Sequence, residues 1–249
     1  MGQGSFGTIE VLEHFVGGFP GVTVGTTVLP AGPEGVMFSS VQEGTFSEVT
    51  DEPGGILQIL TDTAAGDNHF FTIGPFRPAD GGVVMEARFK VSDITTSALY
   101  CGFQETVHAS TPVFAAQITT ETFAYGGVGG FAGLQFDQNS TTDDWRAVAG
   151  DSGVANFSAD SDATRAYNPP VNDKWDVIRV EIDPNRDVRM YLAGDTGPSV
   201  LKLVKGATDV MTDTSLLYAV LAIEVQTADT DLTLEVDYMY ARGYRDWTV

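Results

Sequence analysis

The stretch KWDVIRVEIDPNRDVRMYLAGD, residues 174–195, predicts a β-hairpin, two strands joined by a tight turn. Apolar side chains recur at every second position of its first half, at Ile178, Val180 and Ile182, which is the period of a strand with one buried face. The sequence DPNRD at 183–187 supplies turn chemistry, because proline fixes φ and the Asp and Asn side chains bond to nearby backbone. Alternation resumes after the turn, so the stretch predicts a fold but no reaction.

The polar side chains of this hairpin are candidates for a catalytic site because they are close in sequence. Strand alternation separates them: Trp175, Arg179 and Glu181 share one side of a strand, while Asp183 and Asp187 flank the turn. No two carboxylates are therefore held as a catalytic pair. We interpret the hairpin as the marker of a sandwich core and expect any partner to bind elsewhere.

The rest of the chain repeats the strand pattern. Residues 83–91, VVMEARFKV, alternate most regularly, and 216–225 and 233–240 predict two strong strands near the end of the chain. About twelve strands with turn signals between them, and no convincing helix, predict an all-β protein. We expect a two-sheet antiparallel jelly-roll sandwich.

Composition divides the chain into two parts. Residues 1–50 are rich in Gly, Thr, Val and Pro and predict an extended N-terminal arm with short edge strands. Residues 51–249 then form the jelly-roll domain. Within it, the polar stretch 150–172 is long for a loop of a compact domain, which suggests a functional or interface role.

Charge excludes several classes of partner. The chain has 13 Lys and Arg against 34 Asp and Glu, a net charge of −21. Nucleic acid and anionic membranes both require clustered basic residues, so we expect neither as a partner. The sequence shows no signal peptide and no run of 18 apolar residues, so we expect assembly in the cytoplasm and no membrane span.

Cysteine and histidine offer little chemistry. Cys101 is the only cysteine and alternates with apolar neighbours, so we expect a small core residue; His108, seven residues on, is the only candidate partner for a catalytic thiol. His14, His69 and His108 lack the spacing of a zinc site. We therefore expect no catalytic thiol and no zinc.

Acidic loops could hold Ca²⁺ through oxygen ligands. The candidate ligands are Asp137, Asn139, Asp143 and Asp144 in one loop, and Asp160 and Asp162 in another. Neither loop has the glycine and terminal glutamate of an EF-hand, so we interpret them as solvated and expect no metal and no cofactor. Asn139 and Asn156 also begin glycosylation sequons, which matter only in a secreted protein.

Three segments resemble the concanavalin A-like lectin/glucanase and laminin-G-like jelly-roll superfamily. They are EARFKVSD at 86–93, the hairpin at 174–195, and LEVDYMYARG at 234–243. The chain departs mildly from the pattern at 193–195, Ala-Gly-Asp, where the family often shows Asn-Gly. The resemblance covers residues 50–245. It implies one of three roles: glycan binding, β-glucan hydrolysis, or a structural module of virus and phage particles.

The glucanase branch of this superfamily carries its catalytic carboxylates on a strand of the type Glu-x-Asp-x-x-Glu. The nearest match has Glu235 and Asp237, but Tyr240 stands where the second Glu should be. We therefore expect no catalytic residues and no enzyme. Glycan binding would need exposed aromatic side chains, for which Trp145, Trp175 and Trp247 are the candidates.

These exclusions and the resemblance lead to a ranked set of hypotheses. The first is a non-enzymatic virion structural protein, a capsid decoration or cement protein of a tailed phage. It would bind the major capsid protein, most simply as a homotrimer, and be located in the virion. The alternative is a lectin-like carbohydrate-binding module for surface or tail adhesion, and the third is a divergent glycoside hydrolase.

Overall fold

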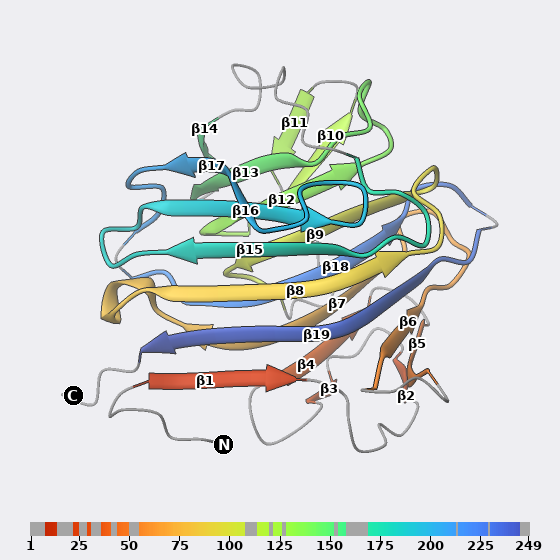
Figure 1. The fold of residues 1–249 in the computed structure, drawn as a ribbon, viewed down its shortest axis with the longest axis horizontal. Coiled ribbons are helices and arrows are strands. Elements are labelled where there is room, and N and C mark those ends of the chain that lie inside the picture. Colours follow the sequence, from red (N-terminus) through yellow and green to blue (C-terminus); the bar gives the residue numbers. More distant parts are fainter. Residues whose placement is uncertain are drawn as a thin grey trace.

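The computed structural model describes most of the chain. The residues that it describes are 8–13, 22–24, 29–30, 36–40, 44–49, 55–107, 114–119, 122–125, 128–151, 154–157, 169–212, 214–228 and 230–244. They form two large antiparallel sheets that face each other, as Figure 1 shows. The all-β sandwich predicted from the sequence is confirmed.

The first sheet, here called sheet A, has nine strands in the order β17-β16-β15-β8-β19-β6-β5-β2, with β1 also beside β19. Its strands are β1 (Thr8–Glu13), β2 (Val22–Val24), β5 (Gly44–Glu48), β6 (Leu57–Leu60), β8 (Val83–Val91), β15 (Asp176–Ile182), β16 (Val188–Gly194), β17 (Lys202–Ala207) and β19 (Thr233–Tyr244). In Figure 1, β1 in red lies alongside β19 in blue, so segments from the two ends of the chain meet in one sheet.

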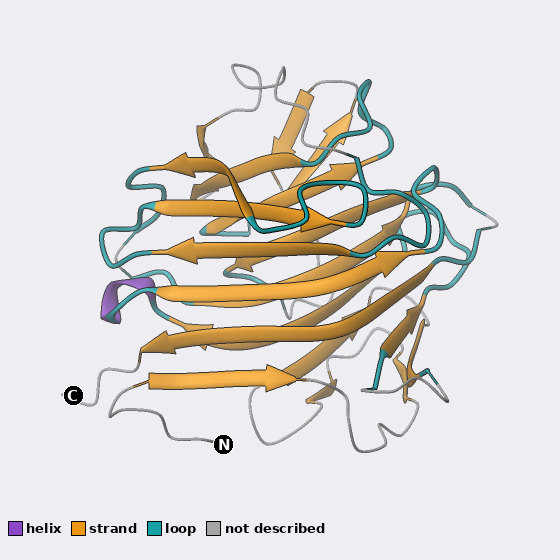
Figure 2. Cartoon of the chain, in the orientation of Figure 1, coloured by secondary structure: helices purple, strands orange, loops and turns teal. Residues whose placement is uncertain are grey.

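The second sheet, sheet B, has eight strands in the order β14-β13-β12-β9-β18-β7-β4-β3. Its strands are β3 (Leu29–Pro30), β4 (Val36–Ser40), β7 (Asn68–Phe76), β9 (Ser97–Gln104), β12 (Phe131–Asp137), β13 (Arg146–Asp151), β14 (Val154–Phe157) and β18 (Leu217–Val225). A separate hairpin pairs β10 (Ala116–Thr119) with β11 (Thr122–Tyr125). A single 3-10 turn, η1 (Pro78–Asp80), joins β7 to β8 (Figure 2). No helix in the described ranges is long and apolar enough to cross a membrane.

The predicted hairpin is confirmed as β15 and β16. Its turn is held by Asp183, whose Oδ1 accepts the backbone N–H groups of Asn185 at 2.8 Å and Asp187 at 3.1 Å. The N–H of Arg186 donates to the carbonyl of Asp183 at 2.8 Å, and Arg186 itself has a left-handed φ of 69°. The Asp183 side chain thus makes turn contacts of the kind that the sequence predicted, and Asn185 takes part through its backbone N–H.

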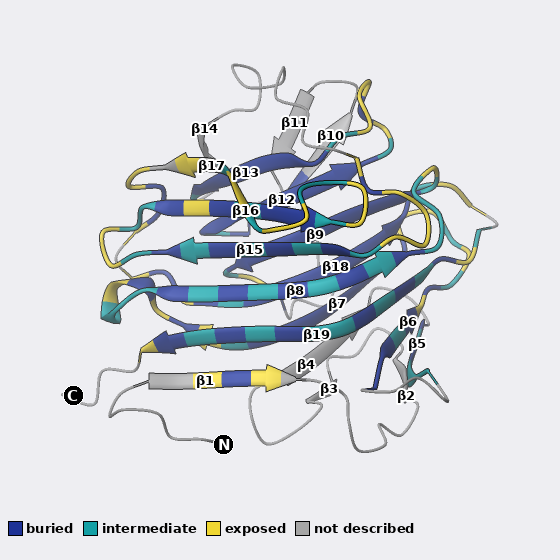
Figure 3. Ribbon diagram, in the orientation of Figure 1, coloured by how far each residue is buried: buried dark blue, intermediate teal, exposed yellow. Residues whose placement is uncertain are grey.

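The main core lies between the two sheets. Strands β8 and β15 alternate between buried and half-buried side chains along their whole length, as Figure 3 shows. Strand β19 does not alternate strictly: a bulge between Val236 and Tyr238 reverses its phase, so Tyr238 points outward and Met239 and Ala241 are buried. One extra residue in a strand has this effect because side-chain direction repeats every two residues.

A second, smaller apolar cluster covers the outer face of sheet B. Phe114, just before β10, packs its ring edge-on against Phe70 at 5.6 Å and lies 6.4 Å from the Tyr100 ring. Gln135 Nε2 also donates to the carbonyl of Ala116 at 2.5 Å, which fixes this segment to β12. The segment leading into the β10–β11 hairpin therefore forms a third layer on sheet B.

The described N-terminal strands extend both sheets. Strand β1 pairs with β19, β2 and β5 join sheet A, and β3 and β4 join sheet B. The described residues form nineteen strands, more than the twelve expected, because strands of two to four residues such as β2, β3 and β14 are too short to show alternation. The predicted domain boundary at residue 50 stays a prediction.

Two predicted loops have different outcomes. Residues 138–145 connect β12 to β13, so the acidic loop that holds Asn139, Asp143 and Asp144 is a hairpin loop, while Asp137 ends the strand before it. The polar stretch 150–172 begins with the end of β13 and includes β14, so part of it is strand. Most of the rest of that stretch lies outside the described residues.

Candidate functional site

A row of polar residues crosses the outer face of sheet B at one end of the sandwich. Glu224 at the end of β18 is in register with Asn68 on β7 and with Ala98 on β9, and Ala98 is in register with Asp137 on β12. Residues in register on antiparallel strands point to the same face, so the three polar side chains lie on one side with the small Ala98 between two of them. All three are buried, with 4%, 6% and 3% of Asn68, Glu224 and Asp137 exposed.

A chain of side-chain amides connects this row to the surface. Gln226 Nε2 donates to Glu224 Oε1 at 2.5 Å, Asn139 Nδ2 donates to Gln226 Oε1, and Gln138 Nε2 donates to Asn139 Oδ1 at 2.7 Å. We use the name "amide relay" for this set of four side chains, which consists of the three amides and the Glu224 carboxylate at its inner end. Asn139 is exposed and Gln138 and Gln226 are half-buried, so the relay runs from solvent to a buried carboxylate.

Two loops hold the relay in place. Asn139 N–H donates to Asp137 Oδ1 at 2.9 Å, which folds the start of the β12–β13 loop over the end of its own strand. Gln226 N–H donates to the carbonyl of Thr96 at 2.7 Å, and Gln138 N–H donates to the carbonyl of Ser97 at 3.2 Å. The amides therefore sit on backbone that is itself fixed to β9.

Burial raises the pKa of Glu224 to about 7. The hydrogen bond from Gln226 opposes this shift, the negative charge of Asp137 adds to it, and the hydrogen bond from Asn68 opposes it, with a further upward contribution from Asp67. Burial disfavours the charged form of a carboxyl, and nearby negative charges disfavour it further, so the group holds its proton to a higher pH. Shifts of this kind are common at binding and catalytic sites. Glu224 thus changes charge near neutral pH.

A buried Asp–His pair supports the row from the side of β7. Asp67 Oδ2 lies 3.0 Å from His69 Nε2, and both side chains are fully buried. The same oxygen accepts the N–H of Asp62 at 2.9 Å. The pair fixes the loop that precedes β7 and places the Asp67 carboxylate close enough to raise the pKa of Glu224.

The carboxylates predicted on β19 lie on the opposite side of the molecule, on the outer face of sheet A. Glu235 Oε2 pairs with Lys90 Nζ at 2.8 Å, and Asp237 Oδ2 pairs with Arg88 Nη1 at 2.5 Å. The same two cations lie over the ring of Trp175, at 4.4 Å for Arg88 and 5.0 Å for Lys90. Glu235 and Asp237 are each paired across strands with a cation, which stabilises the sheet.

The three tryptophans that were candidates for glycan binding differ in their exposure. Trp145 is fully buried, with its ring edge-on to Phe89 and Phe136 at 6.0 and 6.1 Å, so it cannot stack on a sugar in this structure. Trp175 is half-buried beneath the Arg88 and Lys90 cations. Trp247 lies outside the described residues.

The predicted cysteine, histidine and calcium candidates resolve as follows. Cys101 is a buried core residue, as predicted, and burial raises the pKa of its thiol far above the usual value. His14, His108, Asp160 and Asp162 lie outside the described residues. Among the residues that are described, no three His, Cys, Asp or Glu side chains are grouped so that they could hold a metal ion.

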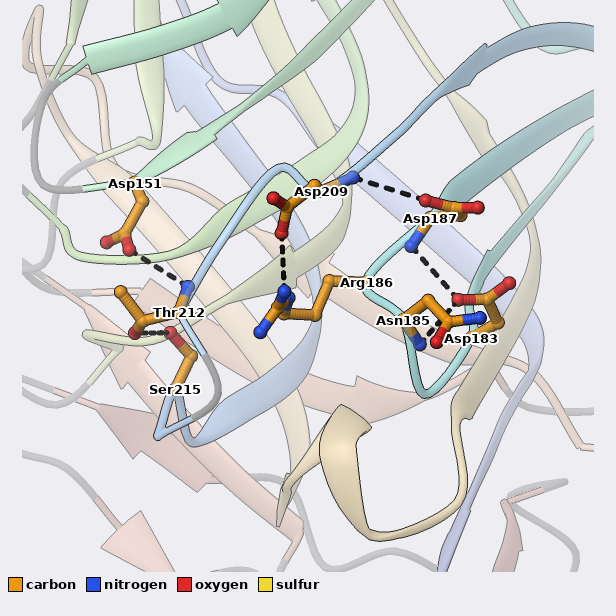
Figure 4. Close-up of polar contacts among 8 residues, drawn as sticks. All are labelled: Asp151, Asp183, Asn185, Arg186, Asp187, Asp209, Thr212 and Ser215. Carbon is orange, nitrogen blue, oxygen red and sulfur yellow. Dashed lines mark hydrogen bonds and ion pairs between the residues drawn. The ribbon is translucent and has the colours of Figure 1, made fainter.

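A second group of polar residues lies where the loop before β18 meets the β15–β16 turn (Figure 4). Arg186 Nη2 pairs with Asp209 Oδ1 at 2.6 Å, and the N–H of Asp209 donates to Asp187 Oδ1 at 3.2 Å. Thr212 N–H donates to Asp151 Oδ2 at 3.1 Å, linking the same loop to β13. These aspartates bind backbone N–H groups or an arginine, which is the bonding of a loop anchor.

That anchored loop also contributes to the main core. Val210 is fully buried and Met211 is 4% exposed, and both belong to the cluster between the sheets. Thr212 Oγ1 lies 3.0 Å from Ser215 Oγ, which fixes the turn into β18. The polar contacts in Figure 4 therefore hold the side chains of Val210 and Met211 in the core between the sheets and have a structural role.

Glu224 and Gln226 were missed from the sequence. The run LLYAVLAIEV at 216–225 was interpreted only as a strong strand. A single carboxylate inside a fully apolar strand was the available signal, because a buried charge requires partners. The amides carried no signal, since a neutral side chain in a loop is common and only tertiary structure brings Gln226 to Asn139.

Comparisons with known proteins bear on the fold. No protein-family model matches the chain, and no curated protein matches its sequence. Among solved structures, a protein of unknown function from Shewanella oneidensis aligns with a TM-score of 0.57 at 10% identity, over 98% of this chain and 90% of the other. Peanut lectin aligns with a TM-score of 0.55 at 12% identity, over 94% and 97% of the two chains. A seed lectin of Lotus tetragonolobus gives 0.51 at 12% identity, over 90% and 100%.

The chain has the concanavalin A-like lectin fold. The likeness spans nearly the full length of both lectins and of this chain, so it concerns the whole sandwich. The jelly-roll resemblance drawn from the sequence is confirmed at this level. Identities of 10–12% carry the fold alone, because one fold hosts many functions.

Proposed function

We propose that this protein is a non-enzymatic, lectin-like carbohydrate-binding module, and that the amide relay at the end of sheet B is its glycan-contacting surface. The observation that carries the proposal is the relay itself: three oriented amides, those of Gln138, the exposed Asn139 and Gln226, lead to the buried Glu224. This was the alternative hypothesis from the sequence. The likeness to two plant lectins supports it by analogy of fold.

The chemistry of the relay suits sugar hydroxyls. A hydroxyl both donates and accepts a hydrogen bond, and an amide offers both functions within one rigid plane. Bonds within the relay use one N–H and one oxygen lone pair of each inner amide, which leaves a second N–H and a second lone pair for a ligand. A buried network that fixes such groups in advance reduces the entropy cost of binding.

The proposal predicts that Asn139→Ala and Gln226→Ala each weaken binding of an oligosaccharide about tenfold, because each change removes one or two ligand hydrogen bonds. A glycan array identifies the sugar, and titration calorimetry then measures its affinity. Asn185→Ala is the matched control, since Asn185 is an exposed amide in the β15–β16 turn and should leave the affinity unchanged. Binding of no sugar on the array, or equal affinities for Asn139→Ala and Asn185→Ala, would contradict the proposal.

The first hypothesis from the sequence, a phage capsid decoration protein that binds the major capsid protein as a homotrimer in the virion, stays a prediction. It expects purified protein to bind expanded capsids in a fixed ratio to the capsid subunit, measured by co-sedimentation and gel densitometry. Failure to co-sediment would rule it out. The two roles are compatible, because a decorating module can also bind glycans.

A further inference from the structure

We propose that the amide relay has two hydrogen-bonding polarities and that the protonation state of Glu224 selects between them. The inference rests on the proposed function for the identity of the ligand and adds a regulatory property to the same site. It concerns three amides that each donate to the next member of the relay, in the direction from Gln138 toward Glu224.

The polarity seen in the structure is the one that an ionised carboxylate requires. An ionised carboxylate can only accept, so Gln226 must turn its Nε2 toward Glu224. Gln226 Oε1 then faces outward and accepts from Asn139 Nδ2, and Asn139 Oδ1 accepts from Gln138 Nε2. Each amide orientation thus follows from the one before it, beginning at the carboxylate.

Protonation adds a hydrogen-bond donor at the inner end, because a neutral carboxyl donates through its hydroxyl while its carbonyl oxygen still accepts. When Glu224 takes a proton from solvent, its hydroxyl needs an acceptor, and Gln226 provides one by rotating its amide through half a turn. Nε2 of Gln226 then faces Asn139, which rotates in turn to present Oδ1, and its Nδ2 donates to the oxygen of Gln138. No covalent bond changes except the one formed between the proton and the carboxylate.

The surroundings of Glu224 favour uptake of that proton near neutral pH. Carboxylates face it from two directions: Asp137 at the end of β12 and Asp67 before β7, the latter bonded to His69. On β9 the facing residue is the uncharged Ala98, and the nearest basic side chain on β13, Arg146, directs Nη2 to Thr142 Oγ1 at 2.5 Å. Burial and these two carboxylates bring the pKa of Glu224 to about 7.

Reversal changes what the surface offers to a ligand. Asn139 is exposed, so its free N–H and free lone pair exchange places when its amide rotates. A sugar hydroxyl placed to donate in one state would then face another donor. Two mismatched hydrogen bonds correspond to about a tenfold change in affinity between the two states.

The relay can be tested without any ligand. In the free protein, residues 1–249, we expect the side-chain amide NMR signals of Asn139 and Gln226 to titrate between pH 5 and 8.5. Glu224→Gln keeps the shape of the side chain but removes the proton, so these signals should then be independent of pH. Asp176→Asn is the matched control, because the pKa of Asp176 is also about 7 and its side chain lies elsewhere, beside Trp145.

Amide signals that stay constant with pH, or that still titrate in Glu224→Gln, would overturn the inference; the first result is expected if Asn68 accepts the bond instead. Affinity for the array-selected oligosaccharide, measured at pH 5.5 and pH 8.5, should differ about tenfold in the wild type and stay constant in Glu224→Gln. Amides that titrate in a protein that binds no sugar would support the reversal and contradict the proposed function. Sugar binding with silent amides would do the opposite.

Discussion

Gly133→Ala is expected to destabilise the protein by about 3 kcal/mol, because its new methyl group has no space. A Cβ at this position would lie 2.6 Å from the carbonyl oxygen of Cys101 and 3.0 Å from the ring of Tyr100. Gly133 is in register with Gly102 in the middle of sheet B, and the Tyr100 hydroxyl is fixed by a 2.6 Å bond to the carbonyl of Phe103. Neither the backbone nor the ring can move away cheaply.

Thermal unfolding followed by circular dichroism measures this effect, and a loss of about 3 kcal/mol lowers the melting temperature by roughly 6–12 °C in a domain of this size. Gly206→Ala is the control, because Gly206 also lies in a strand but its added Cβ would lie 3.4 Å from the Val188 carbonyl oxygen, an ordinary van der Waals distance. Equal melting temperatures for the two variants would show that sheet B tolerates side chains at its centre.

Asp176→Asn is expected to stabilise the protein above pH 7 and to have little effect near pH 4. Burial raises the pKa of Asp176 from 3.8 to about 7; a hydrogen bond from Trp145 opposes this, and the charge of Asp195 adds to it. Between these two values the folded state keeps a proton that the unfolded state has lost. Stability from this group is therefore complete below about pH 4 and is lost as the pH rises through 7.

The size of the effect follows from the shift. Three pKa units correspond to at most about 4 kcal/mol, and Asn avoids this cost because it is never charged. Urea unfolding at pH 4, 6 and 8 measures it, with Asp176→Asn gaining most at pH 8. The raised pKa of Glu224 also lowers the free energy of unfolding as the pH rises through 7. Only the double variant Asp176→Asn, Glu224→Gln should therefore lose both of these pH-dependent contributions. A variant that follows the wild type at every pH would refute the assignment.

The fold was predictable where alternation is long and uninterrupted. The strands β8 and β15 could be read from their apolar positions because nothing breaks their period of two, and β16 keeps that period as far as Leu192. Strand β19 could be located but its faces could not, since the bulge at Val236–Tyr238 reverses them and no residue in TLEVDYMY marks a bulge. Among the short strands of the first 50 residues, β1 pairs with β19 and β4 pairs with β7, and both partners are distant in sequence.

The candidate site was less predictable than the fold. Titratable residues at close spacing are what a sequence shows, and here these were Glu235 and Asp237, which the structure places in ion pairs on sheet A. The relay joins residues 138–139 to residues 224–226, a separation that no local pattern records. The sequence indicated Asn139 only as a possible calcium ligand or glycosylation site, because its contact with Gln226 exists only in the folded structure.

The positions of β18 and β19 have a consequence for how the chain acquires its structure during synthesis. These last two strands occupy the middle of both sheets: β18 separates β9 from β7, and β19 separates β8 from β6. While a ribosome is still making them, each sheet exists only as two halves with unpaired edges. Most pairings are also distant in sequence, which slows folding. The nascent chain therefore exposes these unpaired edges until residues 217–244 have emerged, which favours aggregation and makes it a natural client for chaperones.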